Sequence, residues 1–387
     1  MAFEFIHQQV QQRKVKQLVR ERFCLGSGQG RFIQVSDQQY LNFSSNDYLG
    51  LSQHPKVIAG WKNAADQYGT GSGGSPLVTG YQLPHHQLEQ ALCEWQGKAA
   101  ALLFSSGFSA NQGIIKALLS KQDLLLQDKL NHASLMEAGS LSAAQFKRFT
   151  HNSTERLQTL LASRKANNCL VITEGVFSMD GDQAPLNAIS RLCKQHDAWL
   201  MVDDAHGVGC LGDQGRGSIQ DADLAADDIQ LQMLTFGKAL GVSGAAVLCD
   251  SSVRDYLINF DRSYIYSTAM PAAQAAAVTE AIAVLQTEPE FQETLHQNIR
   301  LFKNLGRDLG LPLLESDTAI QPIILGSSER ALWISEQLKL RGFWVSAIRP
   351  PTVPVNTARL RVTLSSSHRA DDISRLLDTL VDLLRIE

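Results

Sequence analysis

The sequence contains no closely spaced cysteines, no stripe of basic residues and no long apolar run. These absences argue against a metal or redox site, a nucleic-acid-binding protein and a membrane-spanning protein, respectively. Its six cysteines are scattered, and no two of them have the C-x-x-C spacing of metal or redox sites. We therefore expect no metal site. Basic residues number 35 against 39 acidic ones, and no cluster of Lys and Arg forms a stripe that could neutralise phosphates. Nucleic acid is therefore not an expected partner.

Long apolar segments are missing as well, so nothing in the sequence is expected to cross a membrane. Residues 1–17 carry apolar side chains only singly or in short groups, unlike the apolar core of a secretory signal. We expect a cytoplasmic protein with reduced thiols and no membrane partner. The chain has 387 residues, more than a single core usually supports, which predicts one large domain with smaller lobes.

Three common catalytic signatures are absent. The glycine-rich run at 69–81 is not a dinucleotide fingerprint, because no strand precedes it and no acidic residue follows at the required place. The sequence has no G-K-[ST] phosphate loop and no G-x-S-x-G elbow. These observations argue against NAD binding, nucleotide hydrolysis and serine-based ester hydrolysis.

Short apolar runs alternate with helix-period segments until about residue 285. The predicted strands are 100–104, 124–127, 145–149, 169–173, 199–203, 232–236 and 245–249. Parallel strands need crossovers and both sheet faces must be covered, so the pattern predicts an α/β fold with a mostly parallel seven-stranded sheet and helices on both faces.

Three regions are expected along the chain. Residues 1–50 should form an amphipathic helix, over about 3–22, and a hairpin from 31–35 and 40–43. Residues 51–285 should form the large domain. Residues 286–387 should form a smaller α+β domain with strands at 319–325, 343–348 and 359–364.

The predicted sheet has polar loops at the edge where open α/β sheets bind ligands, beyond the carboxyl ends of the strands. Lys238 directly follows one predicted strand and is flanked by Gly237 and Gly241. Its amine could be desolvated there, which would lower its pKa and allow it to form a Schiff base. A lone lysine at a strand end would more simply be solvated, but the neighbouring loops favour the functional interpretation.

A second strand delivers Asp203 or Asp204 to the same edge, where a carboxylate could pair with a protonated pyridine nitrogen. A buried ion pair or a helix cap is the structural alternative. His206, two residues further on, could donate to a phenolic oxygen on such a ring, or could simply pack. Residues 106–108 begin a predicted helix, where free N–H groups and the helix dipole favour a phosphate.

Three more side chains lie near the ends of strands at this edge. Thr235 offers a hydroxyl to the same phosphate, or is an ordinary strand residue. His132 could stack on a flat cofactor and hydrogen-bond reacting groups, or cap the next helix. Ser178 could approach a ring oxygen, although S-x-D-G is typical of a turn. The acidic residues of that loop, Glu174 and Asp180, are expected to be structural.

The segments IRPPTVP and RLRVTL bring Arg349, Thr352, Arg359 and Arg361 close together in sequence. A buried arginine there could hold a substrate carboxylate with two parallel hydrogen bonds. Surface ion pairing is the alternative. Period-2 alternation places Arg359 and Arg361 on one face of the strand, so spacing does not choose between them.

Taken together, the motifs resemble the α-oxoamine synthases of the aspartate-aminotransferase fold, and the resemblance runs nearly from end to end. The segments that carry it are LNFSSNDYLGL, SGGSPLVTGY, SSGFSAN, TEGVFSMDGD, VDDAHGVG, TFGKALGVSGAA, IYSTAMP and IRPPTVP. The resemblance implies an enzyme of fold type I that depends on pyridoxal 5′-phosphate (PLP), with 51–285 as the PLP-binding domain.

Position by position, the resemblance makes Lys238 the Schiff-base lysine, Asp203 the partner of the pyridine nitrogen and His132 the stacking histidine. It implies further cofactor contacts by Gly107, Phe108, Ser178, His206 and Thr235.

The resemblance also implies substrate contacts. Arg20 and Thr352 are similar to substrate-binding residues, and Arg361 is similar to the residue that holds the amino-acid carboxylate. Relatives are homodimers with active sites at the interface, which implies that Ser267 and Thr268 reach the partner's phosphate.

Within the family, the segments are most similar to an acyltransferase of biotin synthesis that joins L-alanine to a pimeloyl thioester with loss of carbon dioxide. The thioester could be carried by coenzyme A or by an acyl-carrier protein. Our hypothesis for the reaction is that Lys238 removes the α-proton as general base and that His132 polarises the acyl carbonyl.

Two alternatives remain at the level of sequence. A sister enzyme could use glycine or serine with another acyl group, as glycine acetyltransferase does, although IRPPTVP and SSNDYLGL favour the alanine enzyme. A non-catalytic relative could bind cofactor or a partner, but the joint presence of Lys238, Asp203 and His132 argues against it. One position departs from the family: Pro76 stands where many relatives have Arg, so acyl contacts there are not carried over.

Overall fold

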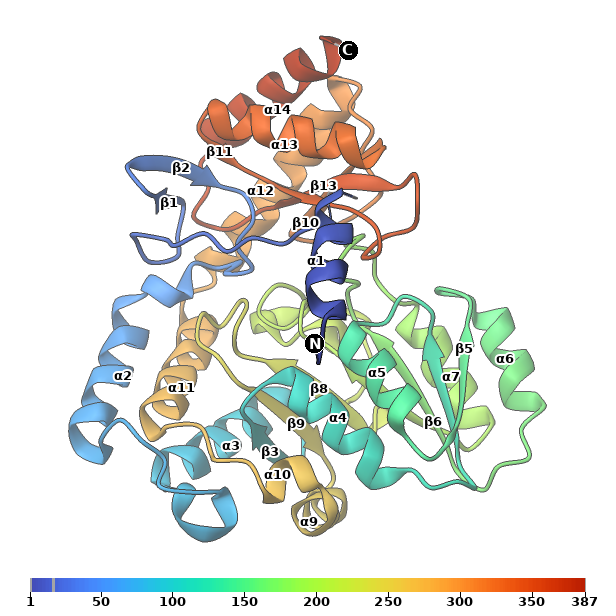
Figure 1. The fold of residues 1–387 in the computed structure, drawn as a ribbon. Coiled ribbons are helices and arrows are strands. Elements are labelled where there is room, and N and C mark those ends of the chain that lie inside the picture. The colour runs from blue at the N-terminus through green and yellow to red at the C-terminus, as the bar shows by residue number, and fades with distance from the viewer. Residues whose placement is uncertain (1, 16–17, 387) are drawn as a thin grey trace.

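The computed structural model describes residues 2–15 and 18–386, and its centre is a seven-stranded sheet (Figure 1). The strand order is β3-β9-β8-β7-β6-β4-β5, and only β9 runs antiparallel to its neighbours. The strands are β3 (Ala100–Phe104), β4 (Leu124–Asp128), β5 (Gln145–Phe149), β6 (Cys169–Glu174), β7 (Trp199–Asp203), β8 (Leu231–Thr235) and β9 (Ala245–Cys249). The predicted α/β fold with a mostly parallel sheet is confirmed.

Helices cover both faces of this sheet because its strands are apolar on both sides. On β3, Leu102 packs in a core cluster with Ile114 of α4, while Leu103 packs in a second cluster with Leu88 of α3. The helices of this part are α2 (Pro55–Tyr68), α3 (Leu83–Gln96), α4 (Gly107–Leu118), α5 (Ala133–Leu141), α6 (Thr154–Ala162), α7 (Leu186–Gln195), α8 (Ser218–Asp221), α9 (Ser251–Phe260), α10 (Arg262–Ile265) and α11 (Ala272–Thr287). Short helical turns lie at Leu51–Gln53, Pro76–Gly80, Asp213–Gly215 and Ala226–Asp228.

A smaller lobe lies above the sheet in Figure 1 and contains an antiparallel sheet of order β10-β13-β12. Its strands are β10 (Ile320–Gly326), β12 (Ser346–Ile348) and β13 (Ala358–Thr363), and its helices are α12 (Glu290–Asp308), α13 (Ser328–Leu340) and α14 (Ala370–Arg385). The predicted strand at 343–348 is divided, because β11 (Phe343–Trp344) joins a different sheet from β12.

That other sheet connects the two ends of the chain. The N-terminal hairpin of β1 (Phe32–Val35) and β2 (Gln38–Asn42) pairs with β11, which runs parallel to β2. Arg31 adds a bidentate ion pair to Asp372 of α14, at 2.6 and 2.7 Å. The hairpin therefore packs with the C-terminal lobe although it precedes the large sheet in sequence.

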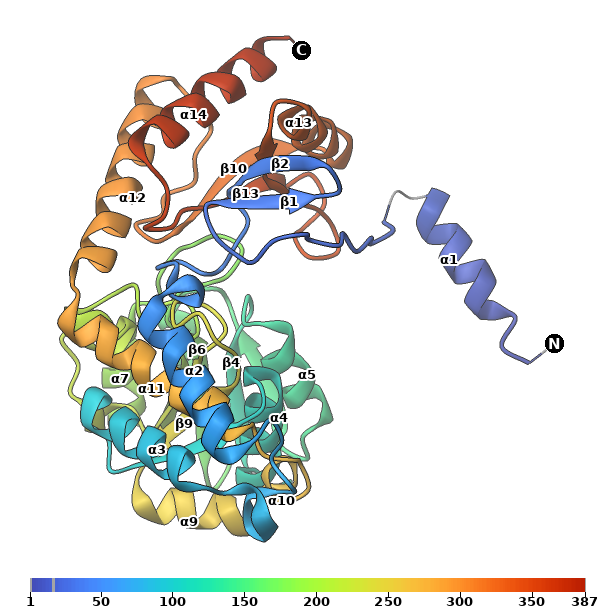
Figure 2. The same ribbon diagram turned by 90° about the vertical axis from the view of Figure 1, so that its left-hand side faces the viewer.

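Helix α1 (Phe5–Val15) projects away from the rest of the chain in Figure 2 and has no buried residue. The predicted helix over 3–22 is therefore too long at its C-terminal end: residues 18–24 are not helical, and 16–17 lie outside the described residues. The helix also buries no apolar stripe in the body of the chain. No helix among the described residues is both long and apolar enough to span a bilayer.

Candidate active site

A cleft at the carboxyl ends of β6, β7 and β8 brings together most of the predicted site residues. It is also lined by the start of α4 and by the residue preceding α5. Its lining includes Gly107, Phe108, His132, Asp203, His206, Thr235 and Lys238. It also includes three residues that the sequence did not single out as functional, Asn111, Ser134 and Glu174.

Lys238 lines this cleft three residues after the end of β8. Burial lowers the pKa of its amine to about 8, although the carboxyl groups of Asp203 and Glu174 oppose that shift. A lysine with such a pKa is partly neutral near pH 7 to 8, and only the neutral amine can act as a nucleophile or a base.

The structure distinguishes the two adjacent aspartates at the end of β7. Asp203 lines the cleft and accepts hydrogen bonds from Asn111 Nδ2 at 2.9 Å and from the Ala205 N–H at 3.2 Å. Asp204 does not line the cleft, is fully buried, and accepts from the Ser218 N–H at 2.9 Å. Burial raises the pKa of Asp204 to about 7. Asp203 is therefore the carboxylate placed to face a ligand.

His132 is oriented by a chain of directed hydrogen bonds. Asn111 Nδ2 donates to Ser134 Oγ at 3.0 Å, and Ser134 Oγ lies 2.8 Å from His132 Nδ1. The Ser134 N–H also donates to His132 Nδ1, at 3.3 Å, so this nitrogen is an acceptor. Burial and nearby Lys238 lower the pKa of His132, which keeps the ring neutral. The ring proton is therefore on Nε2, which makes His132 a hydrogen-bond donor at that atom.

Glu174, at the end of β6, is a site residue that sequence reasoning set aside as structural. It is 3% exposed, lines the cleft and is paired in register with Asp203 on the next strand. Burial and the Asp203 carboxylate raise its pKa well above the ordinary value. Its place at the carboxyl end of a buried strand was the sequence signal that could have identified it.

The part of the cleft at the start of α4 is suited to a phosphate. Helix α4 begins at Gly107, its N-cap residue is Ser106, and the free N–H groups of a helix start attract anions. The Thr235 hydroxyl is buried and has no hydrogen-bond partner within the described residues. A Cβ atom at Gly107 would lie 2.7 Å from the Thr235 methyl group, so only glycine leaves this space open.

These features fit PLP, which needs an amine for its aldehyde, a carboxylate for its ring nitrogen and donors for its phosphate. Lys238 and Asp203 supply the first two groups, and the start of α4 with Thr235 supplies the third. The unpartnered Thr235 hydroxyl is the sign that a polar group of a ligand belongs here.

Two arginines of β13 contact the loop that follows β6, but in different ways. Arg359 forms an ion pair with Asp180. Arg361 Nε donates to the Ser178 carbonyl at 2.7 Å, and its other nitrogens donate to Asn46 and to Thr363. Within the described residues no carboxylate forms an ion pair with Arg361, in contrast to Arg359. Ser178 contributes its carbonyl to this contact and is not among the residues that line the cleft.

Arg20 and Thr352 lie together, in a second pocket. Its walls include Arg13, Leu18, Arg20 and residues 347–352, so three arginines surround it. One wall is formed by β12, which pairs with β13 so that Ser346 is opposite Arg361. The second pocket therefore adjoins the strand that carries the candidate carboxylate-binding arginine.

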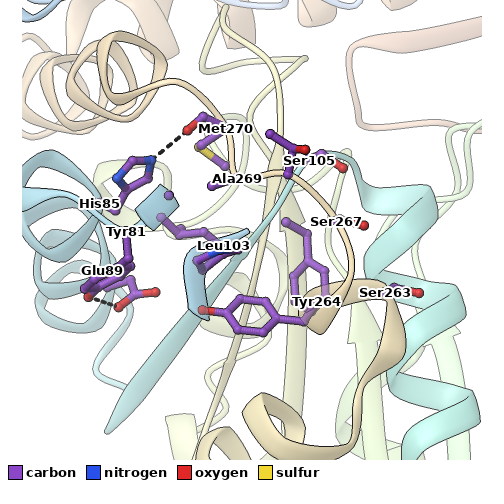
Figure 3. A pocket seen from close by; sticks show the side chains of 14 residues that line it. Tyr81, His85, Glu89, Leu103, Ser105, Ser263, Tyr264, Ser267, Ala269 and Met270 are labelled. Carbon is purple, nitrogen blue, oxygen red and sulfur yellow. Dashed lines mark hydrogen bonds between the residues drawn. The ribbon is translucent and has the colours of Figure 1, made fainter. Parts of the chain in front are cut away.

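A third pocket contains Ser267 and Thr268 (Figure 3). Ser105 lines both this pocket and the Lys238 cleft, so the two are adjacent. Tyr81 donates to Glu89 on its wall at 2.7 Å, and burial raises the pKa of Glu89 to about 7.

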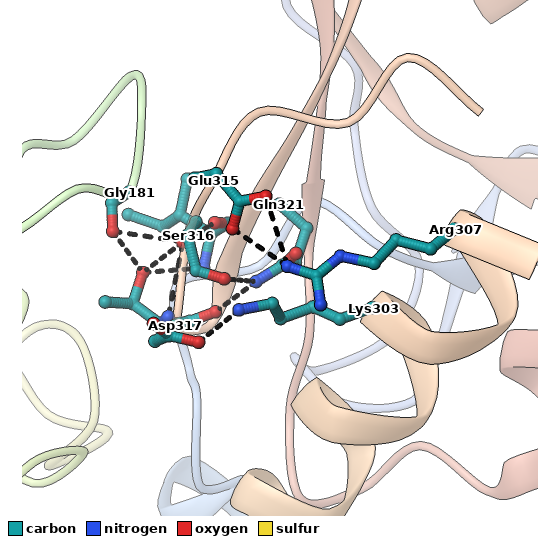
Figure 4. Close-up of polar contacts among 9 residues, drawn as sticks. Gly181, Lys303, Arg307, Glu315, Ser316, Asp317 and Gln321 are labelled. Carbon is teal, nitrogen blue, oxygen red and sulfur yellow. Dashed lines mark hydrogen bonds and ion pairs between the residues drawn. The ribbon is translucent and has the colours of Figure 1, made fainter. Parts of the chain in front are cut away.

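The loop that carries Ser178 is held by contacts from both parts of the chain. Figure 4 shows Ser316 beside Gly181: Ser316 Oγ and Thr318 Oγ1 each lie 3.0 Å from the Gly181 carbonyl. On the other side, His151 bridges Asp128 at 3.0 Å and Asp182 at 2.7 Å. Burial alone would lower the pKa of His151, but these two carboxylates raise it to about 9.

The raised pKa of His151 predicts a pH dependence of stability. The ordinary pKa is 6.5, so the stabilisation by the charged ring is complete below about pH 6.5 and is lost as the pH rises through about 9. We expect roughly 1–3 kcal/mol, because the side chain is partly exposed. His151→Gln cannot titrate, so the difference in free energy of unfolding between wild type and variant should shrink from about pH 6 to about pH 9.5. A difference that stayed constant with pH would contradict the charged bridge.

Comparison with known proteins agrees with this geometry. Residues 38–380 match the family model for class I and II aminotransferases. A serine palmitoyltransferase from S. paucimobilis with PLP and myriocin bound is 29% identical, with a TM-score of 0.93 over 99% of this chain and 98% of that one. Serine palmitoyltransferase of Sphingomonas wittichii is also 29% identical, with a TM-score of 0.93 over 100% and 98%. The 8-amino-7-oxononanoate synthase of Francisella tularensis is 30% identical, with a TM-score of 0.79 over 90% and 98%.

The chain therefore belongs to the class I and II aminotransferase family of fold type I, and its cofactor is PLP. Within that family its solved neighbours are α-oxoamine synthases, and the chain belongs with them. The expected fold and cofactor are confirmed.

Proposed function

We propose that this protein is an 8-amino-7-oxononanoate synthase, which condenses L-alanine with a pimeloyl thioester and releases carbon dioxide in biotin synthesis. The observation that supports this choice is the pocket of three arginines beside β12. A pimeloyl group ends in a free carboxylate, which arginines bind well. A palmitoyl or acetyl group has no charge at its far end.

Serine palmitoyltransferase is the second candidate, because two such enzymes superimpose with a TM-score of 0.93 against 0.79 for the Francisella enzyme. Overall shape reports on the fold, whereas the residues of the acyl pocket determine the substrate. Arg13 and Arg20 are exposed, and an uncharged acyl chain would gain no ion pair from them. The charge of the pocket therefore favours the pimeloyl substrate.

Each side chain has a proposed role. PLP, when bound, supplies an aldehyde and an electron-withdrawing ring. Lys238 carries the cofactor and, once free, removes the α-proton of the amino acid, a role that suits an amine with a pKa of about 8. Asp203 holds the ring nitrogen protonated, and Arg361 binds the amino-acid carboxylate. His132 donates from Nε2 to the acyl carbonyl.

The remaining proposed contacts complete the site. Gly107, Phe108 and Thr235 hold the phosphate, and His206 lies on the ring-oxygen side. Ser178, expected near that oxygen, lies outside the cleft lining and accepts from Arg361 instead. Arg20 and Thr352 hold the distal carboxylate of the thioester. We propose a homodimer with shared sites, to which Ser267 and Thr268 contribute across the interface. The cysteines in the described residues are free thiols, as is typical of a cytoplasmic enzyme.

The substrate is tested by pairing alanine, glycine and serine with pimeloyl, acetyl and palmitoyl thioesters on the PLP-loaded protein. Alanine with the pimeloyl thioester should give the highest kcat/KM, and mass spectrometry identifies the amino ketone. Both the coenzyme A and the carrier-protein thioesters should be supplied. A higher kcat/KM for serine with palmitoyl thioester would overturn the proposal in favour of the second candidate.

Arg20→Ala should raise KM for the pimeloyl thioester by roughly 10–100-fold, the loss expected when a hydrogen bond to a charged group is removed. The KM for alanine should stay near the wild-type value. Arg22→Ala is the matched control, because Arg22 is exposed nearby but does not line the pocket. Equal KM values for the two variants would refute the assignment of the pocket to the distal carboxylate.

A further inference from the structure

Tyr48 lies in the SSNDYLGL segment and contacts His206, a cleft residue, from outside the cleft. Its side chain is 1% exposed, and its hydroxyl lies 2.6 Å from Nδ1 of His206, which is 7% exposed. His206 lines the cleft, whereas Tyr48 does not. The pair is therefore a contact between a cofactor-facing ring and a residue outside the cleft.

The direction of this hydrogen bond follows from the surrounding groups. Burial raises the pKa of Tyr48, so its hydroxyl keeps its proton. Burial, together with the positive charges of Lys238 and Arg361 and the nearby ring of His132, lowers the pKa of His206 well below the ordinary value. A neutral imidazole has one donor and one acceptor nitrogen, so a single proton position must be chosen.

The competing acceptor for the Tyr48 proton is weaker. Asn46 Oδ1 lies 3.3 Å from the Tyr48 hydroxyl and already accepts from two nitrogens of Arg361, each at 3.3 Å. An O–H donor 2.6 Å from an acceptor forms a much stronger bond than one at 3.3 Å. The Tyr48 proton therefore points to His206 Nδ1, and the ring proton of His206 is on Nε2.

We propose that Tyr48 is a positioning residue that fixes His206 as the Nε2–H tautomer, so that His206 offers bound PLP a hydrogen-bond donor instead of an acceptor. A donor suits the negatively charged oxygen of the cofactor ring, whereas a lone pair at the same place would repel it. Tyr48 thus acts on the cofactor through another side chain. The proposal goes beyond the proposed function, because it holds for whichever thioester is used.

The tautomer is measured directly in the wild-type PLP-loaded enzyme by ¹⁵N NMR with labelled histidine, assigned by the loss of one signal set in His206→Gln. We expect an unprotonated Nδ1 and a protonated Nε2. A proton found on Nδ1 of His206 in the wild type would overturn the proposal, without any assay of activity.

A double-mutant cycle then tests whether Tyr48 acts through His206. Tyr48→Phe removes only the hydroxyl and should weaken PLP binding to the apoenzyme by about ten-fold, the effect of one lost hydrogen bond. In His206→Gln, which retains an amide N–H without a tautomer, adding Tyr48→Phe should change the PLP dissociation constant by less than about two-fold. Equal effects of Tyr48→Phe in both backgrounds would show a merely structural role and overturn the proposal.

Tyr256→Phe is the matched control for loss of a tyrosine hydroxyl. Tyr256 donates to the Ala117 carbonyl at 2.9 Å and does not line the cleft. We expect PLP affinity equal to wild type in this variant. These readouts use PLP alone, so a failure of the pimeloyl assignment and a failure of the Tyr48 assignment are distinguishable.

Discussion

Lys238→Ala should lower turnover by at least about 10⁴-fold, the upper end of what a positioned proton-transferring side chain contributes. The amine is placed in the cleft to be both the attachment point of PLP and the base for the α-proton, and the variant lacks both functions. The fold should be retained in this variant, because the Lys238 side chain is half-buried and its amine is held in a desolvated place that does not favour its charge. Removing that amine therefore should not destabilise the protein. Turnover is measured as release of the amino ketone.

Two further measurements separate the loss of chemistry from the loss of structure. Borohydride should fix PLP covalently to wild type, on the peptide that contains Lys238, and should leave the variant unlabelled. Lys129→Ala is the control, because Lys129 does not line the cleft. Turnover by Lys238→Ala at the wild-type rate, or borohydride labelling of a different lysine, would refute the assignment.

The large sheet was predictable because its strands are buried on both faces. Runs such as 100–104 and 245–249 are apolar at every position, so these strands could be recognised without deciding which sheet face is buried. Those two strands lie side by side although they are far apart in sequence. Their antiparallel pairing depends on the path of the chain, which no local pattern encodes.

Elements held by contacts distant in sequence were predicted less well. The division of 343–348 between two sheets depends on the hairpin of β1 and β2, about 300 residues earlier in the chain. The helix predicted over 3–22 has apolar residues at helical spacing, but no described residue of α1 is buried. The helical periodicity of this segment therefore indicated an apolar helix face, but it did not show which part of the protein, if any, packs on that face.

The candidate site was predictable where a residue follows a strand of the large sheet. Lys238, Asp203, His206 and Thr235 line one cleft because the ends of β7 and β8 meet there. The choice between adjacent carboxylates was not predictable from spacing alone. Asp204 accepts a hydrogen bond from the Ser218 N–H at the start of α8. Spacing in the sequence does not show which of the two aspartates faces that helix.

Glu174 shows the limit of interpreting each residue alone. A glutamate after a strand is ordinarily ionised and solvated, and only its position at the carboxyl end of a buried strand pointed to the site. In the fold it is buried and lies beside Asp203, and both effects raise its pKa. The two neighbouring carboxyl groups also differ in their donors, because Asp203 accepts from Asn111 and from the Ala205 N–H.

Asp203→Asn should lower turnover by roughly 10²–10³-fold, the cost of removing one partner from a buried charge pair. The asparagine has nearly the same size and leaves the neighbouring packing in place, but it no longer carries the charge that keeps a ring nitrogen protonated. The loss should appear in kcat with alanine and pimeloyl thioester at saturation. The absorption band of bound PLP should change with it.

The same substitution has a consequence in the apoenzyme that does not depend on PLP. The Asp203 carboxylate raises the pKa of Lys238 against the effect of burial, so its removal should move that pKa further below about 8. The pKa is measured from the pH dependence of amine acylation, with the labelled peptide identified by mass spectrometry. Asp204→Asn is the control: it makes the same chemical change at the next residue, which faces Ser218, and should leave the pKa of Lys238 in place. Equal pKa values for Lys238 in wild type and Asp203→Asn would show that the two groups are not coupled, and the catalytic assignment of both would fail together.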